Sequence, residues 1–201
     1  MRRRTTACWI AIVLLFAAGA AKTPSVVESW LSPGDSSEYK NFIVIGITDD
    51  QQIRHRFEDK FVSHLSGHDV KAVTSHSLVP DLERIEDREA ILNKVMEKRI
   101  DAAITVRLVP LDEGDEGQWA GGWAASMDED TTLRLLIEST LPVPPTEVSR
   151  FGLEIAVWET EHRYRVWAGR TDRLKKKQLG EGAGDFVEYT IQALSDAGLI
   201  R

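Results

Sequence analysis

Apolar residues at two different spacings mark the start of the folded part of the chain. Residues 42–47 are apolar throughout, which is typical of a strand covered on both faces. Thr48 follows, with Gln51 three residues later, and this pair predicts a helix N-cap with a capping box. The predicted helix then has one apolar face and ends at Gly67. The apolar positions of that face are Ile53, Phe57, Phe61 and Leu65.

Two further strands and a second helix complete a βαβαβ pattern. A short apolar segment at 70–73 predicts the second strand, and Asp87 is placed to cap the helix that follows. Residues 102–109 predict the third strand, which Pro110 ends. The second helix should bury Ile91, Leu92, Val95 and Met96. Because the crossover between such strands is right-handed, the three strands should be parallel.

The second half of the chain changes to alternating apolar and polar residues. Residues 151–157 and 164–168 alternate in this way on either side of a short turn, which predicts an antiparallel hairpin. A last helix should run from about Gly184 to Gly198. The sequence therefore predicts a single α/β domain over residues 41–201, with two or three layers. Its parallel βαβαβ core is followed by the hairpin and a C-terminal helix, and residues 21–40 are expected to be irregular.

The chain begins with the order of residues found in a secretory signal. A basic head over residues 2–4 precedes a charge-free apolar segment over residues 5–21 that ends in small residues. The triplet Ala18-Gly19-Ala20 favours cleavage after Ala20, so residues 1–20 would be removed and the mature protein would begin at Ala21. The segment is shorter than the roughly 20 apolar residues of a spanning helix. An uncleaved membrane anchor is the alternative.

The amino-acid composition disfavours nucleic-acid partners and cysteine-based chemistry. The formal net charge is −7, and removal of the three arginines at the start makes the mature chain more acidic still. Such a chain repels phosphate backbones, which disfavours nucleic-acid binding. The single cysteine, Cys8, would leave with the signal. The mature protein would then have no disulfide, cysteine nucleophile or thiolate metal site.

No cofactor, metal or catalytic residue is predicted. The turn at residues 45–50 has one glycine and two aspartates, whereas a phosphate-binding turn needs several glycines. His64 and His68 are four residues apart, but Gly67 ends the helix between them, so with His76 they make an incomplete zinc site. No Gly-x-Ser-x-Gly motif occurs. A hydrolase whose triad assembles only in three dimensions is the alternative.

Two segments are candidates for partner binding. Residues 111–130 are acidic and rich in glycine, and they carry Trp119 and Trp123. Glycines leave these tryptophans little to pack against, which predicts exposure and makes contact with a partner, a glycan or a membrane interface the alternative to folding back over the sheet edge. A basic cluster follows later, of Arg170, Arg173, Lys175, Lys176 and Lys177. The cluster favours a solvated loop before the last helix; contact with anionic lipid or an anionic envelope polymer, or pairing with the acidic segment, is the alternative.

Several core segments resemble a group of uncharacterised bacterial envelope lipoproteins. The resemblance lies in residues 42–50, in Arg56-Phe57-Glu58-Asp59, in residues 101–109 and in residues 166–171, and it covers the mature chain in order. It implies a compact α/β layer similar to the amino-terminal α/β domain of the Tol-system propeller protein, exported and tethered to a membrane. It implies no catalytic residue. Residues 16–20 resemble a lipobox with Ala20 in place of the lipidated cysteine, so the thioether lipid anchor cannot form.

These observations together predict an exported, non-enzymatic binding or assembly module in the periplasm of a Gram-negative bacterium. Its partner would be an envelope protein or polymer, contacted through the sheet edge or through the Trp119–Trp123 loop, with peripheral membrane contact if the signal is retained. The alternatives are the small periplasmic hydrolase and a structural spacer held at the membrane by residues 5–21.

Overall fold

A computed structural model of the chain describes residues 26–33, 37–48, 50–80, 85–110, 150–162, 164–171, 174–175 and 183–201. The predicted signal segment with Ala20 and Ala21, and the predicted loop at residues 111–130, lie outside the described residues.

The described elements form one mixed sheet with helices on both faces. The strands are β1 (Val26–Leu31), β2 (Asn41–Ile47), β3 (Lys71–Thr74), β4 (Ala102–Pro110), β5 (Arg150–Glu159), β6 (Arg165–Thr171) and β7 (Leu174–Lys175). The helices are α1 (Gln51–Leu65), α2 (Ser75–Leu78), α3 (Ile85–Glu97) and α7 (Ala183–Asp196). The strand order is β1-β6-β5-β4-β2-β3, and β7 pairs with β5. Strand β2 is parallel to β3 and β4, and β5 pairs antiparallel with both β4 and β6, so the predicted α/β class, parallel core and hairpin are confirmed.

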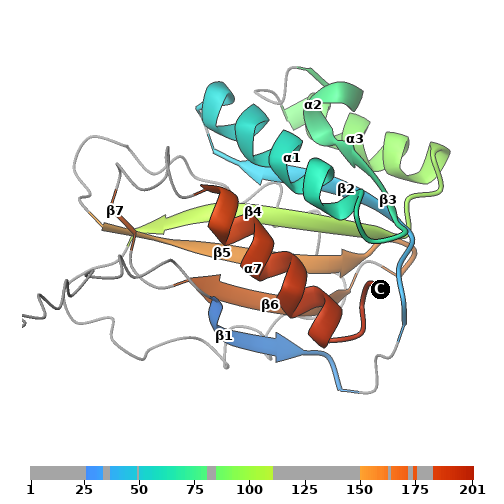
Figure 1. The fold of residues 1–201 in the computed structure, drawn as a ribbon. Coiled ribbons are helices and arrows are strands. Elements are labelled where there is room, and N and C mark those ends of the chain that lie inside the picture. The colour runs from blue at the N-terminus through green and yellow to red at the C-terminus, as the bar shows by residue number, and fades with distance from the viewer. Residues whose placement is uncertain are drawn as a thin grey trace, which may run out of the picture.

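Three layers result from the alternation of side chains along β2. Phe42 and Val44 pack with α1 and α7, while Ile43 and Ile45 pack with α3 on the opposite face. Figure 1 shows α1 and α7 lying across the same side of the sheet. A strand covered on both faces needs apolar residues at every position, and this explains the uninterrupted run of residues 42–47. The predicted C-terminal helix is confirmed as α7, with Phe186 in the core it shares with α1.

The N-cap of α1 differs from the prediction. Asp50 is the N-cap, and its carboxylate accepts hydrogen bonds from the backbone N–H of Gln52 and of Ile53, both at 3.0 Å. Thr48 lies outside the helix, and its hydroxyl oxygen accepts from the Asp50 N–H at 3.3 Å. Both residues are good caps, and a carboxylate beside the positive helix terminus is the more stable choice.

The second predicted helix differs in its N-terminal start and in the extent of its buried face. Helix α3 begins at Ile85, so Asp87 lies inside the helix and does not cap it. Ile91 and Val95 are buried as predicted, but Met96 is 67% exposed. The buried stripe is therefore narrower than the predicted face; Ile91 and Val95 pack with residues of β2, β3, β4 and β5, and Met96 does not.

The segment predicted to be irregular contains an edge strand. Strand β1 pairs antiparallel with β6, with Trp30 opposite Ala168 and Leu31 opposite Trp167. Strand β6 lies more than 130 residues later in the sequence, so the pattern of residues around β1 cannot predict this pairing.

Candidate functional site

The carboxyl ends of the parallel strands β2 and β3 hold a buried polar cluster, the Glu58 cluster, formed by Gly46, Glu58, Ser75 and His76. Glu58 extends from the middle of α1 and is fully buried. Its carboxylate accepts from the Gly46 N–H at 2.9 Å and from the Ser75 hydroxyl at 2.5 Å. It also accepts from the His76 backbone N–H at 3.0 Å and from His76 Nδ1 at 2.7 Å. These hydrogen bonds join α1 to the end of β2 and to α2.

The order of groups in the Glu58 cluster differs from that of a serine hydrolase. In a catalytic relay the histidine lies between the nucleophilic hydroxyl and the acid. Here the hydroxyl of Ser75 donates directly to Glu58, and Ser75 is fully buried. The carboxylate therefore lies between serine and histidine. The four hydrogen bonds satisfy the buried Glu58 carboxylate and join α1, β2 and α2. The order of these groups does not support the hydrolase alternative.

A second layer of charged and aromatic groups covers the outer side of His76. His76 Nε2 lies 3.3 Å from Asp59 Oδ1, and its ring stacks on that of His55 with 4.2 Å between ring centroids. His55 Nε2 lies 3.4 Å from Nη2 of Arg54, which donates to the Pro80 carbonyl at 2.9 Å. Arg54 is 3% exposed. The stacked rings of His55 and His76 are called the histidine pair below.

The three histidines considered for zinc have separate partners. Nδ1 of His64 lies 2.9 Å from the Lys60 carbonyl, one helical turn away. Nδ1 of His68 lies 3.1 Å from the Arg201 carbonyl, and His76 contacts Glu58. The structure does not bring His64, His68 and His76 to one point, so these residues do not form a shared ligand set.

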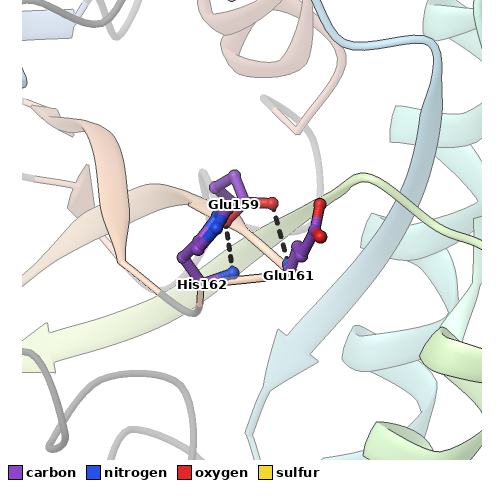
Figure 2. Close-up of side chains that lie close together, drawn as sticks. All are labelled: Glu159, Glu161 and His162. Atoms are coloured by element: carbon purple, nitrogen blue, oxygen red, sulfur yellow. Dashed lines mark hydrogen bonds and ion pairs between the residues drawn. The ribbon is translucent and has the colours of Figure 1, made fainter.

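The turn between β5 and β6 brings together Glu159, Glu161 and His162, whose ligand atoms lie within 4.8 Å of one another (Figure 2). The two dashed lines in Figure 2 are hydrogen bonds from backbone N–H groups to Glu159. The Glu161 N–H donates at 2.8 Å and the His162 N–H at 2.6 Å. Both carboxylate oxygens of Glu159 thus close the turn. Since Glu161 and His162 are exposed, we assign this group a turn-forming role.

Three arginines and one glutamate lie on one face of strands β4, β5 and β6. Arg107 and Arg170 flank Glu154 in the strand register, and Nε of Arg107 contacts the Glu154 carboxylate. The guanidinium of Arg165 lies 5.8 Å from the ring centroid of Trp158. Burial lowers the pKa of Arg165, and the charge of Arg107 lowers it further, while Glu154 opposes both effects. Of these four residues the sequence analysis proposed only Arg170 for partner binding. Arg107, Glu154 and Arg165 come together only when β4, β5 and β6 pair in the sheet.

The remaining residues predicted for partner binding lie mostly outside the described part of the chain. These residues are Trp119, Trp123, Arg173, Lys176 and Lys177. Lys175 lies in β7, where its Cα is opposite that of Arg150 in β5. The partner-binding roles of all six residues stay predictions.

Strand β1 forms one edge of the described sheet, and its only neighbour in the strand order is β6. The Ser32 N–H donates to the Val166 carbonyl of β6 at 2.8 Å. Backbone groups alternate in direction along an antiparallel strand, so those of Trp30 also face β6, and those of Ser29 and Leu31 face away from it. Ser29 is exposed, and Leu31 is 39% exposed. Two outward-facing backbone positions of β1 are therefore accessible.

No protein-family model matches the chain, and no curated protein sequence matches it. Among solved structures, the fold is similar to that of a single-substitution variant of the PelC dodecamer from Paraburkholderia phytofirmans, with a TM-score of 0.48 and 12% identity. This match covers 89% of the present chain and 100% of the PelC chain. A second PelC dodecamer structure from the same organism matches with a TM-score of 0.45 and 12% identity, over 89% of this chain and 99% of that chain.

Within the described residues, none of the helices combines the length and the apolar character needed to cross a bilayer.

Proposed function

We propose that this chain is an exported, non-enzymatic binding or assembly module of the bacterial cell envelope that contacts its partner through the edge strand β1. The partner is an extended segment of another envelope protein, which adds a strand to the sheet. The export signal in the sequence supports the location, and the open edge supports the mode of binding.

The observation that carries the proposal is the outward direction of backbone groups at Ser29 and Leu31. A sheet edge with accessible N–H and C=O groups is a template for an added strand, and main-chain hydrogen bonds then supply the affinity. Natural proteins protect edges with charges, prolines or covering elements. Ser29 and Leu31 provide none of these, and both are accessible.

A site-specific crosslinking experiment in intact cells tests this proposal. A photo-crosslinking amino acid replaces Leu31 on β1 or, as the matched control, Tyr189 on α7, which is 44% exposed. We expect a discrete product with a second protein from the Leu31 position only. A product of twice the chain's own mass, or the same products from both positions, would overturn the proposal.

A substitution at Ser29 tests whether the partner binds through backbone hydrogen bonds of β1 or through side-chain contacts alone. Ser29→Pro removes an outward N–H and leaves the inward hydrogen bonds to β6 in place, since proline is tolerated at strand edges. We expect Ser29→Pro to abolish the Leu31 crosslink and Ser29→Ala, which keeps the N–H, to retain it. Equal crosslinking by both variants would contradict binding through the backbone of β1.

A further inference from the structure

We infer that the segment that adds to β1 is short and carries an apolar side chain opposite Leu31. The inference, which rests on the proposed function, specifies the chemistry of the partner. The length of the open edge and the surroundings of the Leu31 side chain support it.

The open part of β1 is limited at both ends. The register between β1 and β6 shifts between Val26 and Glu28, and such a bulge twists an edge strand away from an added strand. At the other end, Pro33 lies two residues after Leu31 and is exposed, and proline has no backbone N–H to donate. An added strand therefore relies on the N–H and C=O groups of Ser29 and Leu31 for its main-chain hydrogen bonds.

Backbone pairing over so short an edge gives little affinity. Each main-chain hydrogen bond to a partner replaces one to water, so its net contribution to binding is small. Ordering an extended segment on the edge costs conformational entropy at every residue that is fixed. Side chains must supply the remaining affinity, as they supply the specificity of strand addition in general.

Leu31 is the described side chain placed to supply this affinity. Its Cα lies opposite that of Trp167 in β6, and opposite residues of an antiparallel pair direct their side chains to the same face. Trp167 is 2% exposed and belongs to the core shared by α1 and α7, so Leu31 lies on the face of the sheet that α7 crosses (Figure 1). Leu31 itself is 39% exposed at the open edge. Its side chain thus extends the apolar core to the rim of the sheet.

A residue opposite Leu31 on an added strand has its side chain on this same face. An apolar side chain there contacts Leu31 and removes the exposed part of Leu31 from water. A charged side chain would lose water against Leu31 without gaining a hydrogen bond from it. Ser29 is small and exposed, so the residue opposite Ser29 meets little constraint. The edge therefore selects an extended segment with an apolar residue at one defined position.

Photo-crosslinking from Ser29 in intact cells, with Leu31 varied, tests the inference. The photo-crosslinking amino acid replaces Ser29 in full-length chains that retain Leu31 or carry Leu31→Val or Leu31→Thr. Valine and threonine have nearly the same shape and both favour strands, so the two variants differ in a buried methyl or hydroxyl group. We expect Leu31→Val to keep the crosslink to a second protein and Leu31→Thr to lower its yield about tenfold. Equal yields from the two variants would overturn the inference.

The chain that retains Leu31 separates this inference from the proposed function. If that chain gives no product with a second protein, strand addition at β1 is itself wrong. If it gives a product, mass spectrometry of the crosslinked peptide identifies the partner's residues, and we expect an apolar residue within two positions of the crosslink. Only charged and polar residues there would overturn the inference and leave strand addition in place, and this measurement needs no change at Leu31.

Discussion

At the scale of single residues, the buried carboxylate of Glu58 joins α1 to β2 and α2, a role that the sequence pattern does not predict. Glu58 lies in a helix face between two buried phenylalanines, Phe57 and Phe61, and its own side chain is fully buried. Its two oxygens accept four hydrogen bonds from β2 and α2, one of them from His76. A buried carboxylate is tolerated only when its hydrogen-bonding capacity is satisfied, and here four donors satisfy it.

Removing this charge should destabilise the protein strongly. Glu58→Gln keeps the volume but replaces one acceptor oxygen by an NH2 group, so a buried donor of Ser75 or His76 loses its acceptor, and leaving such a group unsatisfied costs about 1–3 kcal/mol. Denaturant unfolding at neutral pH should show this loss. Glu188→Gln, at an exposed position of α7, is the control and should change stability by less than about 0.5 kcal/mol. Equal midpoints for the two variants would contradict the role assigned to Glu58.

At the scale of elements, side-chain spacing located the helices but not the limits of their buried faces. In α1 the residues at spacing four, among them Phe57 and Leu65, do reach the core. In α3 the same spacing extends the apolar face to Met96, which the structure leaves 67% exposed. A sequence shows that two residues share a face of a helix, but the elements packed against that helix in the fold decide how much of the face is buried.

Paired truncations on α3 should show this difference. Ile91→Ala removes a fully buried side chain and should cost about 2–5 kcal/mol, because it leaves a cavity. Met96→Ala should change stability by less than about 0.5 kcal/mol, since its side chain is mostly solvated. Thermal or denaturant unfolding of both variants provides the comparison. A large loss in Met96→Ala would mean that α3 buries the wider face predicted from the sequence.

At the scale of the whole molecule, the predicted export signal and the described domain occupy different parts of the chain. The described domain begins with β1 at Val26, after the predicted cleavage site between Ala20 and Ala21. Cleavage there leaves β1 and its pairing with β6 intact. The proposal of an exported module is therefore compatible with removal of the signal segment, and the absent lipobox cysteine makes a lipid anchor at Ala20 chemically unavailable.

The mature protein should begin at Ala21. N-terminal sequencing of the protein recovered from the cell envelope is the direct measurement, and the expected result is a single start at that residue. The variant Ala20→Arg, which places a charge at the cleavage site, should leave the longer chain in the membrane fraction. An intact Met1 in the unmodified protein would show that the segment is retained as an anchor.

The sequence by itself determined the α/β class, the parallel βαβαβ core, the hairpin and the last helix. These features follow from local periodicity, because each buried face repeats at the spacing of its own element. Only the tertiary structure decided the edge position of β1 and the Glu58 cluster with its histidine pair. Both features depend on groups that the fold brings together from distant positions in the chain. Such choices are settled by packing and by the pairing of buried charges, neither of which leaves a periodic signal in the sequence.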